Sequence, residues 1–356
     1  MIDAPANPRH GEELDEDKLL AYLSEALDVH ASALDIQQFP SGHSNLTYLV
    51  RVPGGDQWVL RRPPHGAQVK SGHDMVREFR ILSALSPHVA WVPHPVALCE
   101  DERVLGAPFY LMERVEGYIL RGSNPQLSGL DEAMWRRLSQ TCVETLVAIH
   151  GVDYVDVGLG ELGHPQGYVE RQVQGWSARY KQAETDAISE MDQVATWLEA
   201  NRPSEAGAAL IHNDYKYDNL VLDPEDITLV RAVLDWEMAT IGDPLMDLGT
   251  SLAYWVEAGD DPILRRLALS PTFQPGNFTR TELVEYYATA SGRDLSNIAF
   301  YYAFGLFKVA IIGQQIYYRF AKGHTQDPRF GGLIHAVRAL AKAAWRVAQT
   351  GRIDAP

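Results

Sequence analysis

The sequence predicts an α+β protein in which strands come first and helices follow. Short runs of alternating apolar residues indicate an antiparallel sheet, at residues 34–39, 46–52, 57–62, 96–99 and 109–112. From Asp131 onward, apolar residues recur instead at the spacing of helices. The change of pattern at Val115–Gly117 predicts two domains, an N-terminal one over residues 1–115 and a larger, mainly helical one over residues 116–356.

Composition narrows the class of protein further. The chain has 356 residues, 46% of them hydrophobic, which suffices for a large core, and its formal net charge is −16. That charge argues against nucleic acid and against an anionic membrane surface as partners. The two cysteines, Cys99 and Cys142, argue against a disulfide framework or a structural zinc site and fit a reducing cytoplasm. The N-terminus lacks the apolar core of a secretory signal.

Residues 299–320 form the most apolar long run of the chain. This run contains Lys308 and Arg319, which a membrane span would rarely tolerate, so we expect a buried amphipathic helix there and no membrane partner.

The first strands frame a loop with the chemistry of phosphate binding. A helix is expected at residues 15–27, where leucines recur at helical spacing behind Asp15 as the N-cap. The turn-rich loop Pro40–Asn45 then joins two strands. Its backbone N–H groups, with the hydroxyls of Ser41 or Ser44, could bind phosphate oxygens of a nucleotide. The loop contains a single glycine, so an ordinary hairpin turn is the alternative.

The strand at residues 57–62 presents its side chains alternately, so Val59 and Arg61 share one face. Val59 could line an adenine pocket while Arg61 reaches the phosphates; the alternative is that Arg61 is a solvated strand charge. A helix is expected at Gly72–Leu85, with Glu78 near its middle, where it could pair with Arg61. An exposed pair would contribute little, so Glu78 matters only if it is buried.

The exit from the expected sheet, Glu113–Gly117, is a second place for nucleotide contacts. A linker there could offer backbone groups of Glu113 and Val115 to adenine. We expect the Val115 N–H to be the donor.

The segment from His212 to Asn219 lies between two apolar, strand-like runs, and Asp235 ends a further apolar run. Asp214 could accept a proton, and Asn219 and Asp235 could share a metal ion, which is the set that phosphoryl transfer from ATP with Mg²⁺ requires. Lys216 adds a cation beside the presumed base. The alternative is that these Asp and Asn residues only form turns.

Helical patterns continue through the C-terminal part. They are expected at Asp131–His150, Gln166–Glu184, Asp186–Ala200, Thr281–Ala290, Asn297–Phe320 and Gly332–Gln349. Asp243 and Pro244 predict the start of another helix, with Asp247 one turn inside it. Asp247 could brace the catalytic loop from a buried position or be a first-turn charge. His150, at a helix C-terminus, is interpreted as structural.

These segments resemble a known family. They are Ser41–Tyr48, Val59–Pro64, His212–Asn219, Leu234–Glu237 and Ile241–Pro244. They are similar to the aminoglycoside phosphotransferase (phosphotransferase enzyme) family, which has a protein-kinase-like fold of two lobes. The subgroup they resemble most is the kinase-like domain fused to some acyl-CoA dehydrogenases.

The resemblance implies roles for individual residues. Asp214 would be the catalytic base, Asn219 and Asp235 would hold Mg²⁺, Glu78 would orient the cation of the nucleotide lobe, and Asp247 would be a supporting acid. Arg61 stands where the family usually has a phosphate-binding lysine; arginine can also bind phosphate, through its planar fork. The metal motif reads Asp-Trp-Glu and not Asp-Phe-Gly, which argues against switching of the protein-kinase kind.

We therefore expect an ATP-dependent kinase that acts on a hydroxyl group of a small molecule. The apolar, aromatic face of residues 297–320 suggests a hydrophobic acceptor, such as a hydroxyacyl compound. An aminoglycoside acceptor would need a pocket crowded with acids, which Glu257, Asp260 and Asp261 could supply unless they are merely solvated. A nucleotide-binding regulatory module without turnover is the alternative from another class. The sequence does not predict the oligomeric state.

Overall fold

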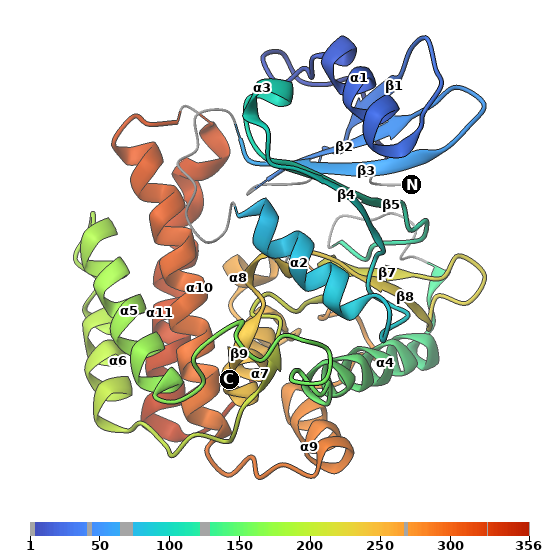
Figure 1. Ribbon diagram of the computed structural model, residues 1–356. Coiled ribbons are helices and arrows are strands. Elements are labelled where there is room, and N and C mark those ends of the chain that lie inside the picture. Colours follow the sequence, from blue (N-terminus) through green and yellow to red (C-terminus); the bar gives the residue numbers. More distant parts are fainter. Residues whose placement is uncertain are drawn as a thin grey trace. The chain divides into compact units, whose positions relative to one another are not determined.

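The computed structural model (Figure 1) describes residues 4–40, 45–64, 74–121, 129–266, 270–325 and 327–355. Their contacts divide the chain into two units. Unit 1 consists of Met1–Ile119, Val157–Leu159 and Asn219–Ala239, and unit 2 consists of Leu120–Asp156, Gly160–Asp218 and Thr240–Pro356. The sequence suggested a single boundary at residues 115–116, whereas the first unit extends to Ile119 and includes a later segment with Asn219 and Asp235.

Within the described part of unit 1, alternating apolar residues form a five-stranded antiparallel sheet of order β1-β2-β3-β5-β4. Its strands are β1 (Asp35–Gln38), β2 (Leu46–Arg51), β3 (Gln57–Arg62), β4 (Pro95–Cys99) and β5 (Phe109–Glu113). One face packs with the helices α1 (Glu16–Leu27) and α3 (Glu102–Leu105), through residues such as Leu23, Trp58 and Leu60. Val59 and Arg61 alternate with that set, so they belong to the opposite face.

A second hairpin completes unit 1. It consists of β7 (Leu220–Leu222) and β8 (Val230–Val233), and the short helix η4 (Trp236–Met238) follows it. Tyr118 and Leu222 exchange backbone hydrogen bonds of 2.8 and 2.9 Å. A Cβ at Gly117 would lie 2.2 Å from the carbonyl oxygen of Leu222, so this approach requires glycine. These contacts explain why the segment joins the first unit despite its late position in the chain.

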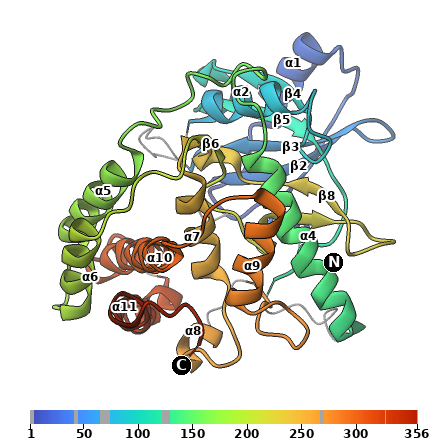
Figure 2. The same ribbon diagram turned by 90° about the horizontal axis from the view of Figure 1, so that it is seen from below.

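Unit 2 is mainly helical (Figure 2). Its helices are α4 (Glu132–His150), α5 (Tyr168–Ala183), α6 (Ser189–Ala200), α7 (Pro244–Tyr254), α8 (Pro262–Arg266), α9 (Arg280–Ser291), α10 (Ile298–Ala321) and α11 (Leu333–Thr350), with the short η5 (Pro328–Gly332) before α11. A short hairpin pairs β6 (Ala209–Ile211) with β9 (Thr240–Gly242), and η3 (Tyr217–Asn219) joins unit 2 to unit 1.

Helix α10 forms the core of unit 2, with α7, α11, α5 and α6 packed against it (Figure 2). Gly249 and Gly305 make the crossing with α7 close, since a Cβ at Gly249 would lie 2.1 Å from the carbonyl oxygen of Tyr301. The prediction of a buried amphipathic helix is confirmed, because Lys308 and Gln314 are buried together with its aromatic residues. No helix in the described ranges is long and apolar enough to span a membrane.

Candidate active site

The side chain of Arg61, in unit 1, is buried among three carboxylates. Its Nη1 lies 3.1 Å from Glu78 Oε1 and 2.5 Å from Asp235 Oδ1, and its Nη2 lies 3.3 Å from Glu237 Oε2. Arg61 is 5% exposed, so the alternative of a solvated strand charge is wrong. The expected pair with Glu78 is formed, and Glu78 on α2 (Met75–Leu85) is buried as its functional reading requires.

Burial and ion pairing act in opposite directions on the charged groups of this cluster. Burial alone would lower the pKa of Arg61, but the Glu78 and Asp235 carboxylates raise it well above its usual value. Burial raises the pKa of Glu78, and the neighbouring guanidinium of Arg61 opposes that rise. Among the described residues, carboxylates of three acids gather around the Arg61 guanidinium, and carboxylate oxygens are the ligands that a divalent ion such as Mg²⁺ prefers.

Asn219 and Asp235 stand at the end of the second hairpin. The Leu234 N–H donates to the carbonyl oxygen of Asn219 at 2.8 Å, so the two strands remain paired up to these residues. Asp235 has a φ of +63°, a left-handed conformation that aspartate tolerates better than most residues and that turns the chain from β8 into η4. Its side chain is 42% exposed, whereas Asn219 is buried.

The donor set fits magnesium held jointly with a nucleotide. Among the described residues, no group of three or more His, Cys, Asp or Glu side chains could hold a metal ion alone. Mg²⁺ usually keeps water and substrate phosphates as ligands beside one or two carboxylates. The oxygens of one carboxylate and one amide, at Asp235 and Asn219, match that pattern.

In unit 2, Asp214 and Lys216 form an ion pair on the loop after β6. The side chain of Asp214 is 24% exposed, so it can meet a substrate, while that of Lys216 is 8% exposed. The Lys216 ammonium lies 5.0 Å from the centre of the Tyr254 ring, and Tyr254 hydrogen-bonds to Asp214. Burial and the Asp214 carboxylate raise the pKa of Tyr254 well above its usual value, so this phenol remains a donor.

Buried groups fix the backbone just before Asp214. Asp247, fully buried, accepts hydrogen bonds of 2.7 Å from both the His212 and the Asn213 N–H groups. The carbonyl oxygen of Asn213 accepts a 2.9 Å bond from the Lys308 ammonium, and Asn213 has a φ of +67°. Asp247 therefore braces the loop, and the reading of a first-turn charge is wrong.

Asp247 is itself supported by His150. The two side chains lie 3.1 Å apart, and His150 also contacts the Tyr287 hydroxyl at 2.7 Å. Burial opposes ionisation of Asp247, but its hydrogen bonds and electrostatic interactions with His150 and His212 hold its pKa below the usual value. His150 is structural, as expected, through this contact with the bracing acid.

The other residues expected to contact the nucleotide differ in what the structure shows of them. Ser41 and Ser44 lie outside the described residues. Val59 is buried between Leu49 and Met112 in the sheet register. The Glu113 N–H already donates to the carbonyl oxygen of His94 at 2.8 Å. Within the described ranges the Val115 N–H makes no hydrogen bond, and its role as a donor to adenine stays a prediction.

Sequence reasoning did not find Lys308, Tyr254 or Glu237 as members of the site. A lysine in the middle of an otherwise apolar helix was the available signal, because a buried charge requires a partner. Two of the three acids suggested for a cationic acceptor pair with a cation of the chain itself, whereas Asp261 is exposed. Glu257 and Asp260 are both paired with the buried Arg280, at 3.0 and 2.7 Å.

Comparison with known proteins identifies the family. The model of the phosphotransferase enzyme family matches residues 35–283. The chain belongs to the phosphotransferase enzyme family. It is 36% identical over 333 residues to acyl-CoA dehydrogenase family member 10 of Mus musculus, and 32% identical over 349 residues to acyl-CoA dehydrogenase family member 11 of Rattus norvegicus. The matches cover 93% and 96% of this chain but only 31% and 44% of those relatives.

Solved structures of phosphotransferases share the fold. A putative aminoglycoside phosphotransferase from Ralstonia eutropha is 32% identical, with a TM-score of 0.79 and coverage of 95% of this chain and 99% of that one. An aminoglycoside phosphotransferase in complex with ADP and hygromycin B has a TM-score of 0.59 at 17% identity, covering 93% of this chain and 98% of that one. The predicted kinase-like α+β fold is thereby confirmed.

Proposed function

We propose that this phosphotransferase transfers the γ-phosphate of ATP to a hydroxyl group of a small molecule. The observation that carries the proposal is the Asp214 carboxylate, partly exposed and paired with Lys216 on a loop that Asp247 holds in place. A general base must be accessible to the acceptor and fixed in direction, and Asp214 meets both requirements.

The nucleotide is assigned to residues 1–115 and the acceptor to residues 116–356. Val59 would contact adenine and the Val115 N–H would donate to it, with Glu113 beside it. Arg61, oriented by Glu78, would bind phosphate together with Ser41 or Ser44. Solved relatives that bind ADP support ATP as the donor.

The proposed reaction needs only ATP, Mg²⁺ and the acceptor alcohol. The acceptor hydroxyl gives its proton to the Asp214 carboxylate, its oxygen forms a bond to the γ-phosphorus, and the bond from that phosphorus to the β-phosphate oxygen breaks, leaving ADP. Lys216 offsets negative charge near the base. Asn219 and Asp235 would hold Mg²⁺, which supplies charge neutralisation of the phosphates when bound.

The acceptor is proposed to be a hydroxyacyl compound rather than an aminoglycoside. The relatives are named acyl-CoA dehydrogenases, and Glu257 and Asp260 are already neutralised by Arg280. The aromatic face of α10, which first suggested an apolar acceptor, is buried in the core and does not support it. Both cysteines are free and buried, which fits our assignment to the cytoplasm.

The test is incubation with ATP, Mg²⁺ and separate pools of hydroxyacyl thioesters and aminoglycosides, followed by mass spectrometry. We expect a mass gain of one phosphate in the first pool. Gain in the aminoglycoside pool alone would reject the acyl acceptor and retain the kinase.

One observation favours a second candidate, a nucleotide-binding regulatory module without turnover. The Arg61 guanidinium is engaged by three carboxylates, so phosphate would have to displace them. If ATP binds but wild type and Asp214→Ala give equally little product in a single turnover with every pool, the module is the correct reading.

A further inference from the structure

Lys308 is a buried cation in the middle of the apolar helix α10. It is 3% exposed, and Phe304, Phe307 and Ile311 on the same helix are buried as well. A methionine of similar length would fill this position without the cost of burying an ammonium group. Packing alone does not explain the lysine, so its polar contacts indicate what it does.

The ammonium binds the peptide group that precedes the presumed general base. Its Nζ donates to the carbonyl oxygen of Asn213 at 2.9 Å and lies 3.5 Å from the Thr250 hydroxyl of α7. The same peptide group carries the N–H of Asp214, which donates to Nδ1 of His212 at 3.3 Å. Lys308 therefore holds one end of the peptide group that leads directly into Asp214.

Asn213 has a backbone conformation that depends on such contacts. Its φ of +67° is left-handed, which is uncommon for a residue with a side chain. Its N–H donates to Asp247 at 2.7 Å, and its side-chain amide lies 3.2 Å from the Tyr168 hydroxyl. Conformations of this kind persist where the surroundings fix them. Loss of the Lys308 contact would release the carbonyl group, and rotation of this peptide group would turn Asp214.

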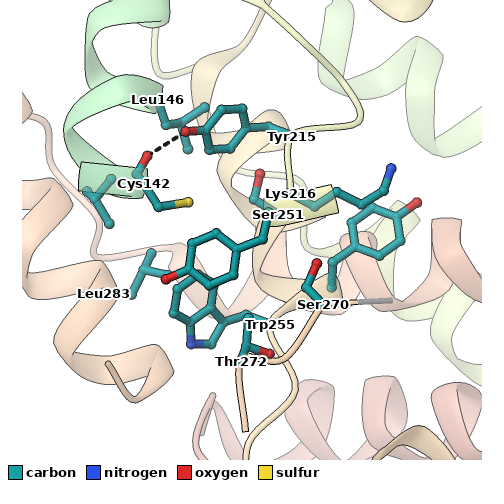
Figure 3. A pocket seen from close by; sticks show the side chains of 12 residues that line it. Cys142, Leu146, Tyr215, Lys216, Ser251, Trp255, Ser270, Thr272 and Leu283 are labelled. Carbon is teal, nitrogen blue, oxygen red and sulfur yellow. Dashed lines mark hydrogen bonds between the residues drawn. The ribbon is translucent and has the colours of Figure 1, made fainter. Parts of the chain in front are cut away.

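The residue after Asp214 is fixed from a different element. The Tyr215 hydroxyl donates to the carbonyl oxygen of Cys142 on α4 at 2.7 Å (Figure 3). In the same view Tyr215 lines a small pocket together with Ser251 and Ser270. The loop is thus held on both sides of the presumed base, so release of the preceding side alone would change the direction of the base without detaching the loop.

We propose that Lys308 is a positioning residue for Asp214: its ammonium holds the Asn213 carbonyl oxygen and thereby directs the Asp214 carboxylate toward the acceptor hydroxyl. In the proposed kinase function, on which this role rests, Asp214 takes the proton of that hydroxyl. Lys308 acts through the peptide group and exchanges no proton with the acceptor.

The protonation of Lys308 gives this role a signature in the pH dependence. Burial lowers the pKa of Lys308 to about 8. The carboxylates of Asp247 on α7 and of Asp214 oppose this shift. The cations Lys216 on the catalytic loop and Arg179 on α5 add to it. Above this pKa the group is a neutral amine, whose hydrogen bond to a carbonyl oxygen is weaker than that of an ammonium. The positioning should therefore weaken as the pH rises through about 8.

The first measurement is NMR spectroscopy of the whole chain and needs no turnover. The dipeptide Asn-Asp occurs once in the sequence, so asparagine labelled with ¹³C at the backbone carbonyl and aspartate labelled with ¹⁵N give one ¹³C–¹⁵N signal, that of the Asn213 carbonyl. In wild type we expect this carbon to move to lower chemical shift with an apparent pKa of about 8, as the bond from Lys308 weakens. Lys308→Met should lack this transition.

The matched control is Gln314→Met, which removes another buried polar side chain of the same helix. Gln314 donates to the carbonyl oxygen of Ala183 at 2.7 Å and to the Thr185 hydroxyl at 2.9 Å. These partners belong to the end of α5 and the segment after it. In this variant the Asn213 signal should titrate as it does in wild type.

The second measurement is kcat with an acceptor that wild type phosphorylates. Below the pKa of Lys308, Lys308→Met should lower kcat by roughly tenfold to a hundredfold, because a misdirected base slows the chemical step, and should leave KM for MgATP unchanged. Wild-type kcat should fall as the pH rises through about 8, whereas that of Lys308→Met should not. Gln314→Met should keep the kcat and the pH profile of wild type.

Circular dichroism establishes that each variant is folded. If Lys308→Met does not fold, Lys308→Arg replaces it, because arginine keeps a charged donor that does not titrate in this range and should hold the Asn213 signal at its low-pH position. A wild-type signal that does not titrate, or one that titrates equally in the Lys308 variant, would overturn the proposal.

Failure of the positioning role and failure of the kinase function give different results. Asp214-dependent transfer with the same kcat and pH profile in wild type and Lys308→Met would reject the positioning role and leave the kinase intact. No Asp214-dependent product from wild type with any acceptor would reject the kinase, and with it a role for Lys308 in catalysis, even where the carbonyl signal titrates as predicted.

Discussion

Lys308 is buried, where an ionised ammonium is unfavourable, and its pKa shift predicts how the free energy of unfolding depends on pH. Its ammonium donates to the carbonyl oxygen of Asn213 at 2.9 Å and lies 3.5 Å from the Thr250 hydroxyl. Burial lowers the pKa of Lys308 to about 8, although the carboxylates of Asp247 and Asp214 act in the opposite direction.

The sign of the pH dependence follows from this shift. The ordinary pKa of this lysine is 10.5 and the folded value is about 8. Between these values the unfolded chain binds the proton and the folded chain does not, so the free energy of unfolding rises with pH across this window and is lowest below it. The 10.5 − 8 difference corresponds to a contribution on the order of 3 kcal/mol.

The change to make is Lys308→Met, which keeps the apolar stem and removes the titrating group. Proton uptake on denaturation, measured by pH-stat near the middle of the window, reports the difference without assuming a two-state transition. Wild type should take up about one proton more than Lys308→Met. The matched control is Lys322→Met at the end of the same helix, where the lysine is exposed and its removal should change uptake little. Equal uptake by wild type and Lys308→Met would refute the reasoning.

Three further predictions concern the metal ligand Asp235, the bracing acid Asp247 and the crossing of α7 with α10. Asp235→Ala should remove a metal ligand and weaken Mg²⁺-dependent ATP binding by roughly tenfold or more, measured by calorimetry with and without Mg²⁺; unchanged binding would refute the assignment. Asp247→Asn replaces one acceptor oxygen by an NH₂ group that faces a backbone N–H. The lost hydrogen bond should lower the free energy of unfolding in urea by about 1–3 kcal/mol, with loss of kcat. Gly249→Ala places a Cβ against the Tyr301 carbonyl of α10 and should cost about 1–3 kcal/mol, whereas Gly332→Ala, with nothing within 4 Å, should cost little.

Patterns that are local in the sequence were predictable. The alternation on strand 57–62 placed Val59 and Arg61 together, and the helical register placed Glu78 where it meets Arg61. Asp243 and Pro244 marked the start of α7, which set the position of Asp247 one turn later. In each case the geometry of a single element, or of one element and its neighbour, determines the contact.

Contacts between distant parts of the chain were not predictable. Lys308 is separated by 95 residues from Asn213, whose carbonyl oxygen it binds, and no local pattern encodes that pairing. Ser251 and Ser270 meet in one pocket only because α7 and the segment before α9 pack together. Glu257 and Asp260 had the composition of a cation site, but the buried Arg280 occupies both.

Asp214 is proposed as the general base of phosphate transfer from ATP, and a single-turnover experiment tests this role. Excess protein is mixed with ATP, Mg²⁺ and pooled small-molecule alcohols, and phosphorylated product is quantified for wild type and Asp214→Ala. We expect product with wild type and a rate lower by roughly 10²- to 10⁴-fold with Asp214→Ala, while both proteins bind MgATP equally. Product formed at the same rate by both proteins would contradict it.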